Sequence, residues 1–433
     1  MHAINSPHFT MTRLLLRRNR RFRLLFSGAA AANLGDGVAA LALPWLATLI
    51  SRDPFDIALV AFATRLPWFL LSLPVGVVTD RTNRQALMFR ADLARLLLSF
   101  GIVALIFAAP ALPLGDGDNA ARGLIVTVSV LAFALGSAEV FRDNAAQTAL
   151  PMLVDPDDLE VANGQIWSIE QIMGQFIGPP VAGFLIALAL PMPFSFNAIA
   201  FGLAAFCVLS ISFPPRAAAR LRASFRAELA GGVKWLWRHG VILQLAVMLG
   251  VMNAGYVAAA TILVLYSQEV LGLGAAGYGL LLTAGAAGGV VGGLVGPALA
   301  AQWGPRTSLI VALAIMPLPY LALYLTGSVI IAGAALFVET LAGLLWNVVT
   351  VSYRQRIIPE EILGRVNSIY RFFGWGLMPV GALAGGAIVS WLEPGSGRDA
   401  ALRAPFLIVG AGTGLMFLYG VCCLRIGRGA ASA

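Results

Sequence analysis

Two long apolar runs of this chain are joined by Gly76-Val77-Val78-Thr79-Asp80-Arg81-Thr82-Asn83-Arg84-Gln85. Asp80, Arg81 and Arg84 put charges into a connection that is far too short to fold as a domain. Hydrocarbon offers no partners to the backbone of an exposed loop, so the flanking apolar runs must be helices that turn around in water. This stretch therefore predicts an integral membrane protein built from helices.

The composition of the whole chain leads to the same fold class. Of its 433 residues, 59% are hydrophobic and only 12% are charged, whereas a soluble globular domain has about 25% charged residues. A membrane-spanning helix needs about 20 apolar residues, so the chain has room for roughly a dozen spans with short connections. We expect an all-α integral membrane protein with twelve transmembrane helices.

The expected spans are separated by clusters of Gly, Pro and charged residues, such as Ser51-Arg52-Asp53-Pro54. They cover residues 24–50, 57–79, 86–110, 122–143, 160–190, 193–213, 240–268, 275–300, 307–326, 328–351, 365–391 and 403–425. The expected division is a basic N-terminus (1–23), a first half (24–213), a basic linker (214–239), a second half (240–425) and a tail (426–433).

The two expected six-helix halves resemble each other weakly, as pseudo-repeats would. Residues 156–163 precede the fifth span and residues 359–367 precede the eleventh. Each stretch then runs into Gly-x-x-x-x-Pro, at Gly174–Pro179 and Gly374–Pro379. Internal repeats of this kind place a site at their interface in many membrane proteins. Two helices that merely start alike are the alternative.

The formal net charge of +8 is spread over every other connection. Arginines are dense before the first span, in the 214–239 linker and around Arg84 and Arg356. The alternate connections hold only Arg52, Arg122, Arg398 and Arg403. This is the positive-inside pattern, which places both termini in the cytoplasm and disfavours nucleic acid as a partner.

The N-terminal region could also be read as a cleaved signal peptide. Its apolar stretch, Leu24–Ile50, is too long for one and contains Asp36, so we expect a first span. Arginine is abundant while Lys234 is the single lysine, which suggests a GC-rich bacterial genome. We therefore expect the protein in the bacterial cytoplasmic (inner) membrane.

The Gly76–Gln85 connection contains the pattern Gly-x-x-x-Asp-Arg-x-x-Arg. This pattern resembles the signature between the second and third helices of major facilitator superfamily transporters. The resemblance implies solute movement across a membrane. The chain departs from the signature at Asn83, which replaces a glycine, and at Gln85, which replaces a basic residue. Asparagine also tolerates left-handed backbone geometry, as glycine does.

The same resemblance assigns this turn to a conformational gate. In the superfamily, the aspartate and the later arginine of the signature form a charge cluster with the fourth and eleventh helices, which locks the outward-facing state. The gate residues expected here are Gly76, Asp80, Arg81 and Arg84, with Glu139 or Asp143 as the acidic partner at the end of the fourth span. Plain anchoring at the cytoplasmic surface is the alternative for the two arginines.

A second stretch, Gly174-Gln175-Phe176-Ile177-Gly178-Pro179-Pro180-Val181-Ala182-Gly183, resembles the fifth-helix antiporter motif, with Ala182 in place of one glycine. Small residues four apart let helices approach closely, and Pro179 is expected to bend the helix where it meets the other half. A generic packing face of small residues is the alternative. Residues 90–95 and 364–376 add to this motif. With them, the chain resembles the drug:proton antiporter branch that includes macrolide-efflux and siderophore (enterobactin) exporters.

Charged residues inside the expected spans are candidates for the solute or proton pathway, because burying an ionised group at bilayer depth is expensive. They are Asp36, Arg65, Glu170 and Glu339. By the resemblance, the first, fourth, seventh and tenth helices line a central cavity, which favours Asp36 and Glu339. Low dielectric disfavours an ionised carboxylate, so such a group can exchange a proton near neutral pH.

Our hypothesis is that Asp36 carries a proton or an organic cation, with Glu339 as its counterpart in the second half. Arg65 would neutralise Asp36 or Glu170 from a neighbouring helix. A silent buried ion pair of Asp36 with Arg65 is the alternative. Asp92 and Arg95, three residues apart, are expected to form a local ion pair on one helix face.

These features predict a secondary active exporter of an amphipathic small molecule that uses proton antiport and alternating access. A lipid or metabolite transporter or flippase without proton antiport is the alternative, and a non-transport membrane scaffold is a weaker one. The sequence has no ATP-binding Gly-rich loop and no His-and-carboxylate metal cluster, so we expect neither an enzyme nor a cofactor. The expected partners are the solute, protons and the lipid bilayer. We expect the protein to be a monomer.

Overall fold

The computed structural model describes residues 15–114, 119–213, 234–359, 366, 369–370, 372–424 and 426, without the side chains of Ser72, Leu73, Asp80 and Asn119. Every regular element in these ranges is a helix. Most of the 364–371 stretch, including Gly364 and Arg371, lies outside the described residues, as does most of the 214–239 linker.

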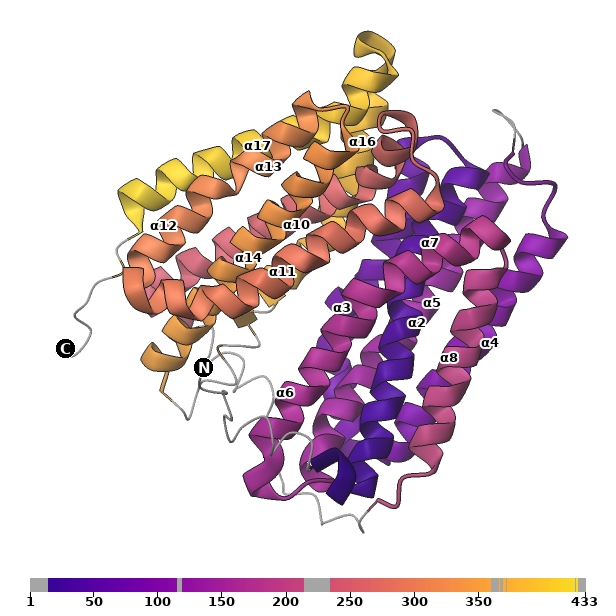
Figure 1. Cartoon of the computed structure of the whole chain (residues 1–433), viewed down its shortest axis with the longest axis vertical. Coiled ribbons are helices and arrows are strands. Elements are labelled where there is room, and N and C mark those ends of the chain that lie inside the picture. The colour runs from indigo at the N-terminus through magenta and orange to yellow at the C-terminus, as the bar shows by residue number, and fades with distance from the viewer. Residues whose placement is uncertain are drawn as a thin grey trace, which may run out of the picture. The chain divides into compact units, whose positions relative to one another are not determined.

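Figure 1 shows the course of these helices. The helices of the first six spans are α2 (Arg20–Ile50), α3 (Pro54–Arg81), α4 (Arg84–Ala108), α5 (Asn119–Ala149), α6 (Leu159–Glu170), α7 (Gly178–Leu188) and α8 (Met192–Leu209), with α6 and α7 in the same span. They are followed by α10 (Gly240–Glu269), α11 (Ala275–Trp303), α12 (Pro305–Ile315), α13 (Pro317–Leu325), α14 (Val329–Ile357), α16 (Met378–Ser396) and α17 (Arg398–Cys423).

Twelve segments of the described residues are long and apolar enough to cross a membrane. This confirms the all-α fold with twelve spans, and the observed spans follow the predicted ones closely; the seventh, for example, covers Gly240–Glu269 against a predicted 240–268. Helices are required here because only they satisfy every backbone group within the segment.

The fifth and ninth spans are divided in ways that hydrophobicity does not indicate. In the fifth span, α6 continues into a π-helix, Gln171–Ile177, before α7 begins at Gly178. In the ninth, α12 ends at Ile315 and α13 begins at Pro317. Proline lacks a backbone N–H and disrupts the hydrogen bonding of the preceding turn, and both divisions lie next to prolines.

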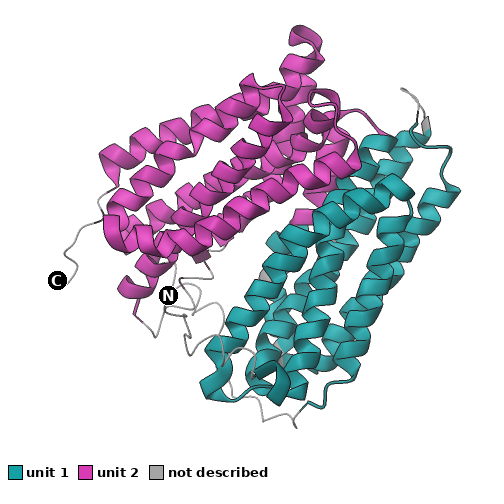
Figure 2. Cartoon of the chain, viewed as in Figure 1, with its two compact units in different colours: residues 1–50, 66–219 teal, residues 51–65, 220–433 magenta. Residues whose placement is uncertain are grey.

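The chain forms two compact units, which Figure 2 colours separately. The first contains residues 1–50 and 66–219, and the second contains residues 51–65 and 220–433. Each has its own apolar core. The core of the first includes Phe22, Met88 and Val208, and that of the second includes Leu245 and Trp346. The second unit thus takes in the connection after the first span and the first part of α3, in addition to the residues expected of the second half.

The turn between the second and third spans is shorter than predicted. Helix α3 continues to Arg81 and α4 begins at Arg84, which leaves only Thr82 and Asn83 between them. Asn83 has φ −72° and ψ 118°, so its backbone is extended, and its side-chain oxygen accepts a hydrogen bond from the backbone N–H of Ala86. The left-handed geometry considered for Asn83 is therefore wrong. It acts as the N-cap of α4.

In the first unit, the glycine-rich fifth span packs tightly against α2. A Cβ atom on Gly37 would lie 2.3 Å from the carbonyl oxygen of Gly174, and one on Gly178 would lie 2.5 Å from the Cα of Gly37. Real Cβ atoms do not approach this closely, so only glycine allows the contact. Pro179 lies at the start of α7, which contacts α2 of the same unit.

The second unit uses the same packing device. A Cβ atom on Gly381 would lie 2.2 Å from the carbonyl oxygen of Ala254, and one on Gly385 would lie 2.4 Å from that of Ala258. Both alanines belong to α10 and both glycines to α16. The two units therefore share a packing device. The segment at or just after Gly-x-x-x-x-Pro packs against the first helix of its predicted half, which is α2 in the first unit and α10 in the second.

Candidate functional site

A cluster of buried charges in the first unit brings together three helices. Arg95 of α4 forms an ion pair with Asp36 of α2, and its Nη1 lies 3.4 Å from Oδ1 of Asp92, one turn earlier on α4. From α5, Arg142 places its Nε 3.8 Å from Oδ1 of Asp92 and its Nη1 3.3 Å from Oδ1 of Asp143. The local pair expected for Asp92 and Arg95 exists, but it is one part of this larger cluster.

The two guanidinium groups lie at the centre of the cluster. The side chains of Arg95 and Asp92 are 1% and 0% exposed, whereas that of Asp36 is 25% exposed. The Arg95 guanidinium also lies over the ring of Phe201, with its Cζ 3.9 Å from the ring centroid, a favourable cation–π geometry. Asp36 is therefore a partly accessible edge of an otherwise buried network.

Among the residues that the structure describes, three aspartates contact these two guanidinium groups. Besides the three aspartates, Glu139 lies within electrostatic range of Arg95, and Glu170 within range of Arg142. Within the described residues, Oδ2 of Asp92 and Nη2 of Arg142 are buried without a hydrogen-bond partner. Buried polar groups are normally satisfied, so these two atoms set the cluster apart from an ordinary packed core.

This arrangement combines residues that the sequence analysis placed in two separate roles. Asp36 and Glu170 were predicted in a solute or proton pathway, and Glu139 and Asp143 in a gate. The structure places all four around the same pair of arginines. Arg142 was missed because it fell in the last turn of the expected fourth span, 122–143, whereas α5 continues to Ala149. A basic residue that deep in a span is a candidate by its position alone.

Asp36 has an ion-pair partner that the sequence analysis did not consider. The charge of Asp36 is paired with Arg95 of the third span. Arg65 is exposed and belongs to the second unit. Sequence proximity of the first and second spans suggested the pairing with Arg65, but it does not indicate which helix faces Asp36.

In the second unit, Glu339 of α14 has an uncharged partner. The hydroxyl of Tyr320 on α13 donates to Oε1 of Glu339 over 3.2 Å. Tyr256 of α10 lies within electrostatic range of the same carboxylate. Among the described residues, Glu339 has no ion pair within 4.0 Å, and it is half-buried. It thus differs from Asp36, whose charge is already paired.

The predicted gate residues have other contacts in the structure. Arg84 donates from Nε to Oγ1 of Thr148 over 3.1 Å and from Nη1 to Sδ of Met152 over 3.1 Å, both near the end of the fourth span. The side chain of Asp80 lies outside the described residues. Gly76 lies inside α3, where an added Cβ would meet nothing within 4 Å, and Arg81 is exposed at the end of that helix.

Gln85 has a role that the sequence did not reveal. Its side-chain amide donates to the backbone carbonyls of Val208, Leu209 and Ile211, over 3.0, 3.3 and 2.9 Å. Val208 and Leu209 end α8 and Ile211 follows it, where carbonyls of the last turn have no further helical N–H to accept from. A basic residue at this position would carry a charge, whereas the neutral amide joins the start of the third span to the end of the sixth.

Acidic, histidine and cysteine side chains do not assemble into a metal site in the part of the chain that the structure describes. The clusters of both units consist of carboxylates, guanidinium groups and tyrosines within candidate membrane spans. Such groups can exchange protons or bind charged solutes.

Residues 14–407 match the family described as transmembrane secretion effector. The chain belongs to this family of major facilitator superfamily transporters. Within the family, the multidrug efflux pump Tap of Mycobacterium tuberculosis (strain ATCC 25618 / H37Rv) is 27% identical over 246 residues, which cover 53% of this chain and 54% of the pump. Tap of Mycolicibacterium fortuitum is 26% identical over 244 residues, covering 52% and 54%. The chain thus spans about half the length of the curated relatives it matches.

Solved transporter structures share the fold of this secretion effector family member. A bacterial homologue of the iron transporter ferroportin in an inward-facing state superposes with a TM-score of 0.70 at 18% identity, covering 93% of this chain and 99% of that one. The nucleoside transporter NupG gives 0.70 at 10% identity, covering 94% and 100%. At these identities the likeness shows the fold alone. The chain is a multi-pass membrane transporter of the major facilitator superfamily.

Proposed function

We propose that this protein is a proton-coupled exporter of an amphipathic small molecule, working by alternating access as a monomer in the bacterial cytoplasmic membrane. The positive-inside distribution of arginines supports cytoplasmic termini. Multidrug efflux by the Tap relatives supports export of drug-like solutes, and the resemblance of the sequence to macrolide-efflux and siderophore exporters adds macrolide-like or siderophore-like metabolites as candidates.

The observation that carries the proposal is the charge cluster around Arg95 and Arg142. In the described part of the chain, Asp36, Asp92 and Asp143 contact two guanidinium groups there, and a low-dielectric site cannot keep every carboxylate ionised at low cost. The cluster is therefore suited to holding one exchangeable proton. Asp36 is the natural carrier, because it is the partly exposed carboxylate in contact with Arg95.

The mechanism follows from the ion pair between Asp36 and Arg95. Protonation of Asp36 removes its negative charge and weakens its hold on Arg95, which keeps Asp92 as a partner at 3.4 Å. The strength of the contact between α2 and α4 then depends on the proton. Alternating access would couple this change to movement of the helices, with Asp80 and Arg84 in the cytoplasmic gate.

Glu339 is the proposed counterpart for the solute. Its carboxylate is bonded to a tyrosine hydroxyl and is close to the exposed Tyr256. A carboxylate with aromatic neighbours suits an organic cation, which gains both charge pairing and cation–π contact. Arg65 and Glu170 are assigned to the same pathway as secondary charges.

The test is replacement of Asp36 by Asn in inside-out membrane vesicles, with uptake of a lipophilic cationic dye measured under an imposed pH gradient. We expect the gradient-driven part of uptake to fall by about 100-fold or more, as for loss of an essential proton-transfer group. Exchange of dye across the membrane without a gradient should persist.

Asp157→Asn is the matched control, because Asp157 is an exposed carboxylate outside the cluster, and it should keep full uptake. Wild-type coupling in the Asp36→Asn protein would refute the proton role. Dye movement that ignores an uncoupler in the wild-type protein would favour the alternative, a lipid or metabolite transporter without proton antiport.

A further inference from the structure

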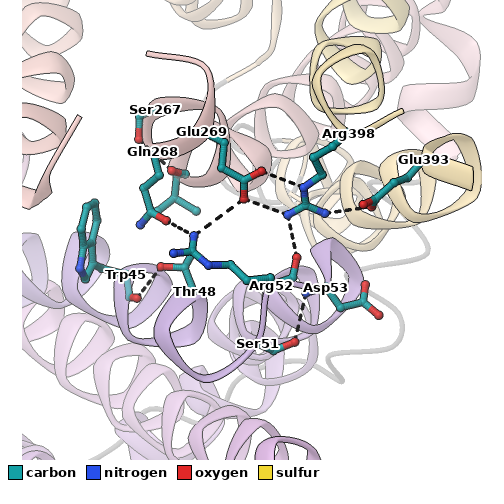
Figure 3. A network of polar contacts seen from close by, with 11 residues as sticks. Trp45, Thr48, Ser51, Arg52, Asp53, Ser267, Gln268, Glu269, Glu393 and Arg398 are labelled. Carbon is teal, nitrogen blue, oxygen red and sulfur yellow. Dashed lines mark hydrogen bonds and ion pairs between the residues drawn. The ribbon is translucent and has the colours of Figure 1, made fainter. Parts of the chain in front are cut away.

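A second charged network, shown in Figure 3, lies where several spans end in the second unit. It joins the connection after the first span, Ser51–Asp53, to the end of α10, the end of α16 and the start of α17. Counting crossings along the chain, all four lie on the membrane side opposite to the start of the first span. The Gly76–Gln85 turn lies on the other side.

Arg398 is the centre of this network. Its Nε and Nη2 lie 2.8 and 3.0 Å from the two carboxylate oxygens of Glu269, a bidentate pair. Its Nη1 donates to Glu393 over 2.9 Å, and Nη2 also donates to the backbone carbonyl of Arg52 over 2.8 Å. The planar guanidinium fork can satisfy several acceptors with fixed geometry in this way, which lysine cannot.

The connection itself is held by further contacts. Arg52 donates to the side chain of Gln268 and lies 3.8 Å from Glu269. The hydroxyl of Ser390 on α16 donates to Asp53 over 3.0 Å. A Cβ atom on Gly386 would lie 2.5 Å from the carbonyl oxygen of Pro54, so the start of α3 is packed directly on α16.

The network differs in kind from the cluster around Arg95. The side chains of Arg398 and Glu269 are each 27% exposed, and that of Arg52 is 45% exposed. Water can therefore solvate these charges when the pairs separate, so opening the network costs far less than opening a fully buried one. Its bonds are suited to repeated breaking and forming.

We propose that Arg52, Gln268, Glu269, Glu393 and Arg398, which we name the Arg398 latch, form a reversible lock for the membrane side opposite to the Gly76–Gln85 turn. Ser51 directly follows Ile50, the last residue of α2, and α2 belongs to the first unit. Any movement of the first unit against the second therefore pulls on the connection that the latch holds. The latch closes this side in one state and must open before the solute can leave.

This inference rests on the proposed alternating-access export. A permanent structural clip is the competing explanation, because it would use the same contacts. The two differ in one measurable property. A latch sets the balance between two conformations, so weakening it shifts their populations, whereas weakening a clip changes stability alone.

The experiment measures the distance between two spin labels by pulsed electron paramagnetic resonance in nanodiscs. Cysteines at Ala189 and Gly327, both exposed at span ends on the latch side, report on one unit each, in a protein whose native cysteines are replaced. Arg398→Gln should increase the ratio of long to short distances by about tenfold, since hydrogen bonds to a charged group contribute about 1.5–3 kcal/mol and 1.4 kcal/mol is a factor of ten.

The control is Asp399→Asn on the same helix turn. Asp399 pairs with Arg403 over 2.9 Å and is outside the latch, so its loss should leave the distances unchanged. Glu393→Gln, which keeps the bidentate pair, should give a smaller shift in the same direction. If Arg398→Gln fails to fold, high salt on the wild-type protein should shift the populations the same way, because it screens exposed pairs.

Identical distances in the wild-type, Arg398→Gln and high-salt samples would overturn the latch. Equal shifts in Arg398→Gln and Asp399→Asn would overturn it too, because the effect would then not depend on the latch contacts. The measurement uses no solute and no proton gradient. A failed latch therefore appears in the distances, and a failed exporter appears only in the vesicle assay.

Discussion

The contact between Gly37 and the fifth span makes a sharp prediction for the substitution Gly37→Ala. The new Cβ would lie 2.3 Å from the carbonyl oxygen of Gly174 and 2.9 Å from its carbonyl carbon and Cα. All three are backbone atoms, so no side chain can rotate away. The α2 helix and the π-helix would have to separate by about 1 Å to restore ordinary contact distances.

The size of the effect follows from this geometry. Overpacking a well-packed site costs about 1–3 kcal/mol, and a purely backbone clash belongs at the upper end, so we expect a loss of about 3 kcal/mol. The displaced helix also carries Asp36, the residue before Gly37, so its ion pair with Arg95 would be disturbed as well. Proton-driven uptake should fall together with stability.

The assay is unfolding of the purified protein in mixed micelles by increasing fractions of SDS, with vesicle uptake measured in parallel. Gly164→Ala is the matched control, since an added Cβ at this helical glycine meets nothing within 4 Å. It should stabilise the protein by about 0.5–1 kcal/mol. If Gly37→Ala unfolds at the same SDS fraction as the wild type and transports normally, the close-contact reasoning is wrong.

Three further predictions test other contacts. Gln85→Ala removes the donor to three carbonyls at and just after the end of α8 and should lower the free energy of unfolding by about 1–2 kcal/mol in the same assay. Gln85→Glu should lower it further, since a carboxylate cannot donate and is repelled by the carbonyl oxygens. Arg95→Met leaves buried carboxylates unpaired and should cost about 3–5 kcal/mol, and a double-mutant cycle with Asp36→Leu should show a coupling energy above about 0.5 kcal/mol. Glu339→Gln should reduce vesicle uptake of a cationic dye and spare that of a neutral one, whereas Tyr320→Phe, which removes only the hydroxyl, should have a smaller effect.

The spans of this protein could be predicted from its sequence because hydrophobic length is a property of each segment alone. The seventh span illustrates this, with bounds at Gly240 and Glu269 that a count of apolar residues nearly reproduces. The ends were harder where polar residues continue a helix. The fourth span extends past Asp143 to Ala149, so Arg142 lies two turns before the end of α5 and not at its last turn.

The partners of the charged residues could not be predicted, for a related reason. A span that is apolar on all sides has no pattern to show which face packs against which neighbour. Asp36 could therefore be identified as a candidate while its partner, Arg95, could not. Gln85 was recognised only as a departure from a signature, because its acceptors at the end of α8 lie more than a hundred residues further along the chain.

The charge cluster also has a consequence for how the protein is made. Asp92 and Arg95 pair within α4, and Arg142 and Asp143 pair within α5, so each of these four charges can enter the bilayer with a partner on its own helix. Asp36 has no such partner on α2; its arginine arrives only with the third span. An unpaired aspartate at mid-membrane costs about 2.5–3.5 kcal/mol during insertion by the translocon. We therefore expect α2 to remain near the translocon until α4 emerges, so that the order of synthesis controls the first step of assembly.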